Sequence, residues 1–307
     1  MAQDKKLAVE VSGWLRVYDD GSVDRTWTGP PEIKFMIESV APHEQFIEGV
    51  ATRDVRTSMT TTNDGSIHCA RLYLSEKIPQ GQYKTAHTHA LPWWRFLHHR
   101  TRFVHHRLPA AIDDGFAAFK WLQSVTRGDA HDTWLEEYGD FDKVFIIGDS
   151  SGGNLIHEVA ARAGSADLSP IRLAGAIPIH PGFVRSIRSR SEIEMPQSPF
   201  LTLEMVDKFF SLALPIGSSK DHPFTCPMVA PPIDGLKLPP FLLCVAEKDL
   251  MRDTEMEYYE AMKKANKEVD LFVSKGMTHC FYLNKIAVDL DSTVRSQMDA
   301  LIGRMGG

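Results

Sequence analysis

Short apolar runs alternate with amphipathic segments along the second half of the chain. The apolar run at residues 144–147 predicts a strand that is buried on both faces, and further strands are predicted at residues 173–179, 241–246 and 269–273. Helical spacing predicts helices at residues 109–125, 151–162, 253–264 and 287–302. Gly164 is the expected stop of the second helix. This alternation is typical of an α/β fold with a mainly parallel central sheet covered by helices on both faces.

Residues 180–238 do not continue the alternation. The segment is long and rich in Ser and Pro, with one helix predicted at residues 203–212. We expect it to form a cap outside the sheet, together with the first 50 residues, where a turn at Asp19-Asp20-Gly21 indicates a hairpin. The interpretation is a single domain over residues 1–307, with cap elements at about 1–50 and 183–235.

Composition and charge exclude several classes of protein. The chain has 307 residues, of which 43% are apolar and 24% charged, so it can bury a core and is not disordered. A net charge of -6 provides no basic face for nucleic acid or an anionic membrane. The four cysteines lack metal-type spacing, and no membrane-length apolar run or secretion signal is visible. We therefore expect a cytoplasmic protein with free thiols and no membrane or nucleic-acid partner.

The first chemical signal is a G-x-S-x-G motif at Gly148-Asp149-Ser150-Ser151-Gly152. An apolar strand is predicted directly before it and a helix directly after it, which is the context of a nucleophile elbow. The sharp turn would lift the Ser150 hydroxyl above the sheet edge. The backbone N–H of Ser151 would then face the reacting carbonyl oxygen. The non-catalytic alternative is an ordinary Gly/Ser-rich turn between a strand and a helix.

A serine nucleophile needs a histidine base and a carboxylate that orients the base. Asp249 follows the predicted strand at 241–246, and His279 lies in a loop before the final helix. The chain order Ser, Asp, His is the order found in α/β hydrolases. Asp253 is the competing acid. Taken singly, Asp249 could be an ordinary carboxylate at a helix start, and His279 an ordinary loop histidine.

Residues 11–17, 148–154, 177–183 and 245–250 resemble plant carboxylesterases of the hormone-sensitive-lipase type, most of all the hypersensitivity-related members. The resemblance covers about residues 5–80 and 105–290. It implies an α/β-hydrolase core with a mainly helical cap that cleaves short-chain carboxylic esters without a cofactor. The family's nucleophile, acid and base fall on Ser150, Asp249 and His279. Gibberellin receptors share this fold but lack the histidine, so His279 argues against a receptor role.

The chain departs from the family at the oxyanion loop. The family carries a His-Gly-Gly-Gly loop upstream of the nucleophile, and residues 85–99 of this chain contain no such loop. The strand that follows this loop in the family also has no counterpart around residues 83–105. Codons can be chosen for residues 91–98 such that reading them from the second base gives Phe-His-Gly-Gly-Gly-Phe-Cys. Because tryptophan has a single codon, the two glycines that overlap Trp93-Trp94 are required in this shifted frame, whereas codon choice permits the other residues. We interpret residues 83–102 as an out-of-frame segment with a deletion, which predicts reduced activity.

Three alternatives stay open. The histidines of this segment and its flank could bind a metal; they are His87, His89, His98, His99, His105 and His106. No Asp, Glu or Cys is interleaved with them, so we expect no metal and no cofactor. The chain could also bind a small ligand without turnover, or act as a lyase-type dehydratase. Arg185, Arg188 and Arg190 form either a solvated surface or a receptor for an acidic substrate group. Natural substrate and oligomeric state are not predicted.

Overall fold

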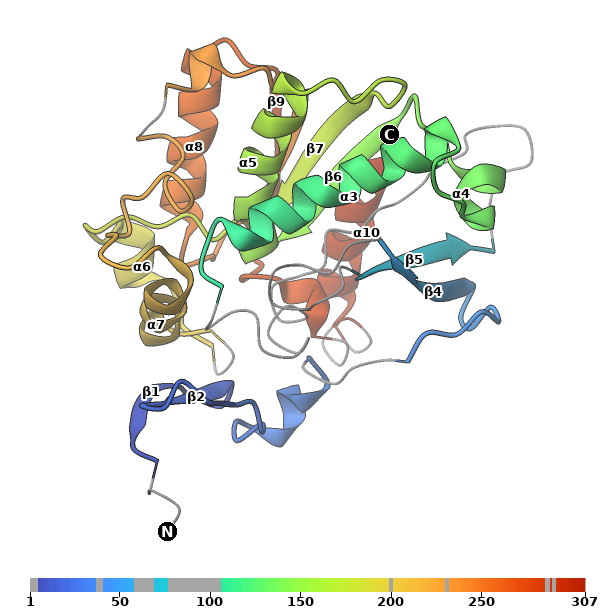
Figure 1. Cartoon of the computed structure of the whole chain (residues 1–307). Helices are drawn as coiled ribbons and strands as arrows, with labels where there is room; N and C mark the ends of the chain where they lie inside the picture. The colour runs from blue at the N-terminus through green and yellow to red at the C-terminus, as the bar shows by residue number, and fades with distance from the viewer. Residues whose placement is uncertain are drawn as a thin grey trace.

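The computed structural model describes residues 5–36, 41–57, 69–76, 106–198, 201–229, 232–284, 288 and 291–306. Its centre is a sheet of four parallel strands in the order β6-β7-β8-β9 (Figure 1). The strands are β6 (Val144–Asp149), β7 (Leu173–Ile179), β8 (Phe241–Ala246) and β9 (Val269–Ser274). All four correspond to the apolar runs, so the predicted strands and the α/β class are confirmed.

Side chains alternate across this sheet and form two hydrophobic clusters, one on each face. On β8, Leu243 belongs to one cluster and its neighbour Cys244 to the other. The first cluster packs under α3 (Ala110–Arg127), α5 (Ser151–Ser165) and α8 (Arg252–Lys264). The second cluster contacts Val294 of α10 (Ser292–Gly306). Because both faces are covered, β7 and β8 are apolar along their whole length rather than at alternate positions.

The predicted helix end at Gly164 was wrong. Helix α5 continues through Gly164 to Ser165, and the glycine instead serves close packing: a Cβ there would lie 1.8 Å from the Lys237 carbonyl oxygen. Helix α10 runs from Ser292 to Gly306, whereas the predicted start at residue 287 falls in a stretch of which only the helical Val288 is described. The Asp291 carboxylate accepts the Thr293 N–H at 2.8 Å at the start of α10.

The remaining described elements surround this core. They are β1 (Leu7–Val11), β2 (Leu15–Tyr18), β3 (Val23–Asp24), η1 (Pro31–Met36), β4 (Val50–Arg56), β5 (Cys69–Ser75), α4 (Thr133–Tyr138), α6 (Arg190–Glu194), α7 (Leu203–Ala213), η2 (Ile233–Gly235) and η3 (Phe281–Leu283). Strands β1 to β3 form an antiparallel sheet, as the hairpin signal predicted. This sheet contacts α7, where Trp14 lies edge-on to Phe209 with ring centroids 6.0 Å apart.

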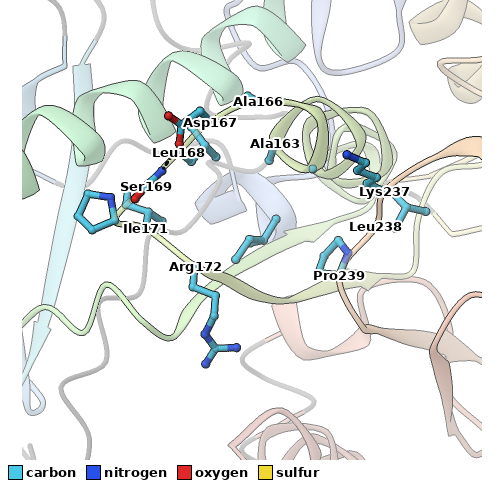
Figure 2. Close-up of a pocket in the computed structure, with 13 residues that line it drawn as sticks. Ala163, Ala166, Asp167, Leu168, Ser169, Ile171, Arg172, Lys237, Leu238 and Pro239 are labelled. Carbon is cyan, nitrogen blue, oxygen red and sulfur yellow. Dashed lines mark hydrogen bonds between the residues drawn. The ribbon is translucent and has the colours of Figure 1, made fainter.

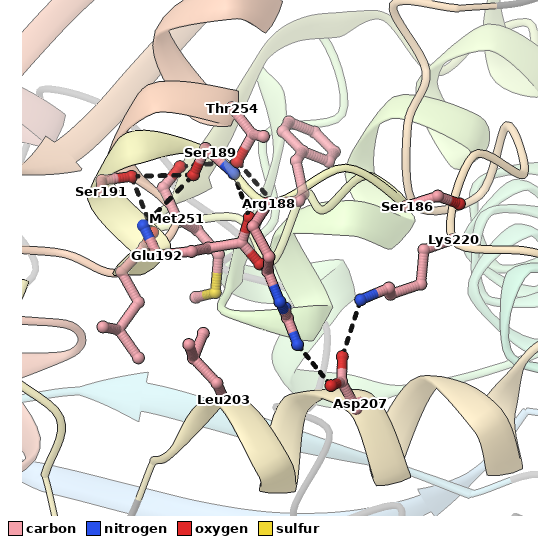
Figure 3. Close-up of polar contacts among 12 residues, drawn as sticks. Ser186, Arg188, Ser189, Ser191, Glu192, Leu203, Asp207, Lys220, Met251 and Thr254 are labelled. Atoms are coloured by element: carbon pink, nitrogen blue, oxygen red, sulfur yellow. Dashed lines mark hydrogen bonds and ion pairs between the residues drawn. The ribbon is translucent and has the colours of Figure 1, made fainter. Parts of the chain in front are cut away.

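Ion pairs hold the segment between β7 and β8 together (Figure 3). Arg188 bridges Glu192 of α6 and Asp207 of α7, and Lys220 also binds Asp207 at 2.8 Å. The flanking arginines are paired as well, Arg185 with Glu257 and Arg190 with Glu194. The arginine cluster is therefore occupied by carboxylates of the chain itself, which argues against its role as a receptor for an acidic substrate.

The expected loss of a strand and of the oxyanion loop around residues 83–105 lies outside the described residues. The described chain resumes at His106 and is packed immediately afterwards, since the Leu108 N–H donates to the Ala213 carbonyl at 2.8 Å. Among the helices of the described part, none has the length and apolarity that a bilayer crossing requires.

Candidate active site

Ser150 occupies a strained turn between β6 and α5. Its backbone has φ 53° and ψ -122°, a combination that non-glycine residues rarely adopt. The turn needs glycine at two neighbouring positions. A Cβ at Gly148 would lie 2.5 Å from the Gly152 carbonyl oxygen, and one at Gly153 would lie 2.8 Å from the Pro181 Cα. At Gly152 the nearest atom would be 3.9 Å away, so the last glycine of G-x-S-x-G is not sterically required.

The fold brings Ser150, Asp249 and His279 together from three separate loops. Each follows the carboxyl end of a parallel strand, namely β6, β8 and β9. His279 Nε2 lies 2.9 Å from Ser150 Oγ, and its Nδ1 lies 2.6 Å from Asp249 Oδ2. Asp249 is fully buried, and His279 is 5% exposed. In the neutral tautomer that fits these contacts, Nδ1–H donates to Asp249 and Nε2 accepts from the Ser150 hydroxyl.

The buried pair of Asp249 and His279 favours charge separation. Burial opposes ionisation of Asp249. The charge of His279 and the hydrogen bonds that Asp249 accepts from His279 and from the Met251 N–H favour its ionised form, and the pKa of Asp249 lies below its ordinary value. Burial is the largest single influence on His279 and disfavours the imidazolium. The charges of Asp249 and Cys280 and their hydrogen bonds to His279 together exceed it and hold the pKa of His279 well above its ordinary value. An imidazolium formed by taking the Ser150 proton is therefore stabilised at this position.

The competing acid has other partners. Asp253 Oδ2 accepts the Ser191 N–H at 2.8 Å, and its Oδ1 binds the Arg252 guanidinium at 2.8 Å. These contacts hold the start of α8 to α6 and involve no contact with His279. Of the two carboxylates left open by the sequence, the structure thus places Asp249 beside the histidine.

Ser151, the predicted oxyanion donor, is the first residue of α5. An N–H at this position has no acceptor within its own helix and can face a ligand. The histidines proposed as metal ligands lie outside the described residues, except His106. Among the described residues, no group of three or more His, Cys, Asp or Glu side chains has the arrangement of a metal site.

Three polar residues around this site, one partly and two fully buried, were not predicted from the sequence. Asp149 accepts a hydrogen bond from the Tyr282 hydroxyl at 3.2 Å, and burial raises the pKa of Asp149. His180 and Glu255 are fully buried. A signal existed for Glu255, because it lies one position from Thr254 and three from Tyr258 on the face of α8 that packs inward. Asp149 and His180 directly adjoin strand ends and carry no such periodic signal.

Neither carboxyl oxygen of Glu255 has a hydrogen-bond partner among the described residues. Burial, followed by the nearby charge of Asp249, raises the pKa of Glu255 well above its ordinary value of 4.5. The folded state therefore holds this proton more tightly than the unfolded chain does. The resulting stabilisation is complete below the unfolded pKa and is lost as the pH rises through the folded pKa.

Glu255→Gln, which is neutral at every pH, is expected to be more stable than the wild type at pH 8. The gain arises because only the carboxyl, not the amide, must be kept protonated or be ionised while buried. It should amount to about 1.4 kcal/mol for each pH unit between the unfolded and the folded pKa, and should shrink toward pH 4.5. Thermal unfolding followed by circular dichroism at both pH values measures the difference. Glu260→Gln, on the exposed side of the same helix, is the matched control. A constant difference between Glu255→Gln and wild type at all pH values would contradict this prediction.

A groove of about 480 Å³ lies between the end of α5 and the loops that lead into β7 and β8 (Figure 2). Its lining includes Ala163, Arg172 and Lys237. These residues lie at the amino ends of the strands, whereas Ser150, Asp249 and His279 follow the carboxyl ends. The groove is therefore separate from the candidate active site.

Comparisons with known proteins agree with this architecture. The family described as alpha/beta hydrolase fold matches residues 104–283. The chain is 36% identical to a gibberellin receptor of Arabidopsis thaliana over 185 residues, which cover 59% of this chain and 51% of the receptor. Indeed, the chain spans about half the length of several curated relatives that it matches.

Other relatives are matched over nearly their whole length. The protein named probable carboxylesterase 6 of Arabidopsis thaliana is 29% identical, over 95% of this chain and 90% of that protein. The 2-hydroxyisoflavanone dehydratase of Glycyrrhiza echinata is 30% identical, over 91% of each chain. The crystal structure of a thermostable esterase from Pseudomonas putida has a TM-score of 0.60 at 17% identity, over 89% of this chain and 95% of that one. This last similarity indicates a shared fold.

Proposed function

The chain belongs to the α/β-hydrolase family, and from this premise we propose that it is a serine carboxylesterase acting on small, short-chain esters. Ser150 is the nucleophile, His279 the base and Asp249 the acid that orients it. The observation that carries the proposal is the position of His279, within hydrogen-bond distance of both Ser150 and Asp249. The similarity to a carboxylesterase over most of the chain supports the reaction class.

The geometry accounts for each proton transfer of the proposed reaction. Ser150 Oγ attacks the ester carbonyl carbon while its proton passes to His279 Nε2, 2.9 Å away. Asp249 stabilises the imidazolium, and the Ser151 N–H donates to the oxyanion. The C–O bond to the alcohol then breaks as the alcohol takes the proton from His279. Water repeats the sequence on the acyl-enzyme, releasing the carboxylic acid and restoring Ser150.

A cap over this site is part of the proposal. We assign it to residues 1–50 and 183–235, within a single domain. The contact between Trp14 and Phe209 supports the assignment, since it joins the N-terminal hairpin to α7. The ion pairs of Asp207 with Arg188 and Lys220 support it further, because they connect α7 to the rest of the insertion.

A non-catalytic binding protein is the second candidate, favoured by the 36% identity to a gibberellin receptor. A lyase-type activity is the third, favoured by the match to a dehydratase over 91% of both chains. Incubation with p-nitrophenyl butyrate and with a fluorophosphonate probe separates these candidates from an esterase. Hydrolysis with labelling of Ser150 supports the esterase. A folded protein that neither hydrolyses the ester nor reacts with the probe would overturn it.

The altered segment should limit the rate of this reaction. Replacing residues 91–97 by Phe-His-Gly-Gly-Gly-Phe-Cys, the peptide of the shifted frame, is expected to raise kcat because it supplies missing oxyanion donors. Each donor is worth about 100- to 1000-fold in a serine hydrolase. The measurement is p-nitrophenyl butyrate hydrolysis, and a replacement with Pro for the three Gly residues, which lacks their backbone N–H donors, is the control. Equal activity of the two replacements would count against the out-of-frame interpretation.

A further inference from the structure

His180 lies at the crossing between β7 and the loop that carries His279. Its side chain is completely buried, and its backbone adopts a positive φ of 44°. Its N–H donates to the Cys244 carbonyl of β8 at 2.8 Å. On the other side, its ring Nδ1 accepts the N–H of Cys280 at 3.0 Å. Since Cys280 directly follows His279, this contact fixes the backbone next to the base.

The same short segment also holds the nucleophile. The Ser150 N–H donates to the Ile179 carbonyl at 2.9 Å, and the Gly182 N–H donates to the Ser150 carbonyl at 3.0 Å. Residues 179–182 therefore contact the backbone of Ser150 on one side and the His279 loop on the other. The distance between Ser150 and His279 thus depends on this segment.

The protonation of His180 suits such a role. Burial lowers the pKa of His180 to about 3, so the ring is neutral. Because Nδ1 accepts a hydrogen bond, the single ring proton resides on Nε2. The ring centroids of His180 and His279 are 6.0 Å apart. A charged His180 would repel the imidazolium that forms on His279, whereas the neutral ring provides an acceptor without this repulsion.

We propose that His180 is a positioning residue that holds His279 within reach of Ser150 through the hydrogen bond from the Cys280 N–H to its Nδ1. The proposal rests on the proposed esterase function. His180 is completely buried and reaches the candidate site through the backbone of Cys280, so its removal should affect the chemical step rather than substrate binding. A displacement of about 1 Å in such a geometry can cost about 100-fold in rate.

Two variants of His180 test the hydrogen bond. His180→Leu removes the acceptor, while His180→Asn places an amide oxygen at the position of Nδ1 and tolerates a positive φ. The matched control is His157→Leu in α5, a buried histidine with one side-chain hydrogen bond, to Tyr258 at 2.9 Å. Thermal unfolding of each variant, compared with the wild type, shows whether a loss of activity arises from a loss of stability.

We expect His180→Leu to lower kcat by about 10- to 100-fold with KM close to the wild-type value, and His180→Asn to recover most of this loss. His157→Leu should retain kcat. Two further readouts do not depend on turnover: hydrogen exchange of the Cys280 amide, and the NMR signal of the His279 proton shared with Asp249. His180→Leu should accelerate the exchange and weaken that signal, unlike the other two variants.

The outcomes separate this proposal from the esterase proposal. An inactive wild-type protein with the expected exchange and proton-signal differences would overturn the esterase and support the anchoring by His180. Unchanged exchange at Cys280 in folded His180→Leu would overturn the anchoring, whatever the activity. A loss of kcat in His180→Asn equal to that in His180→Leu would also overturn it.

Discussion

Ser150→Ala is expected to abolish fluorophosphonate labelling. It should reduce ester hydrolysis to the residual rate that substrate binding and oxyanion stabilisation give without a nucleophile. Loss of the nucleophile in a serine hydrolase costs up to about 10⁶-fold in kcat. The effect should be this large because the proposed base, His279, contacts the Ser150 hydroxyl directly. Labelling and p-nitrophenyl butyrate hydrolysis, compared with the wild type, measure the loss.

Ser165→Ala is the matched control for this variant. Ser165 is an exposed serine at the far end of the same helix, α5. Its replacement removes a serine hydroxyl from this helix without changing the candidate active site. It should label like the wild type. Mass spectrometry of the labelled protein provides an independent check. A probe attached to a residue other than Ser150 would contradict the assignment of the nucleophile.

Asp249→Asn is expected to lower kcat by about 10⁴-fold, because the amide favours the wrong tautomer of the histidine. It should also change the pH profile. In the wild type, activity should rise with pH through a pKa above the ordinary histidine value of 6.5, since only neutral His279 accepts a proton. Without the Asp249 charge and its hydrogen bond, burial, the largest single influence on His279, is opposed only by Cys280, so the pKa of His279 should fall. The rise of the residual activity should therefore move to lower pH.

Asp253→Asn is the control for the choice of acid. Its carboxylate binds Ser191 and Arg252, so its replacement should affect the contact between α8 and α6 and leave the pH profile unchanged. Steady-state rates from pH 5 to 9 for both variants measure the difference. A loss of activity confined to Asp253→Asn would show that Asp253, not Asp249, orients the histidine.

Local sequence patterns were sufficient to place the strands and the turn around Ser150. Apolar runs such as 173–179 and 241–246 coincide with β7 and β8, because strands covered on both faces require apolar side chains at every position. The strand–turn–helix context of Ser150 is equally local. Gly164 was wrongly predicted to end its helix, because its small size serves a contact with Lys237, which is remote in sequence.

The candidate site could be predicted as a set of residue types, because catalysis by serine requires a histidine and a carboxylate in a known chain order. Asp249 was predicted over Asp253 from its place after the strand at 241–246 and from the family resemblance. The partners of Asp253 could not be predicted, because its contact with α6 involves a segment about 60 residues earlier in the chain. The buried environment of Glu255 and the tautomer of His180 likewise depend on distant packing.

Backbone propensity and hydrophobic periodicity act over a few residues, so they are readable along the chain and specify strands, helices and the turn at Ser150. The hydrogen bond between Ser150 and His279 joins residues 129 positions apart, and the one between His180 and Cys280 joins residues 100 apart. These contacts depend on the packing of β6, β7, β8 and β9 side by side. No local pattern encodes them, because they are properties of the assembled sheet and its loops.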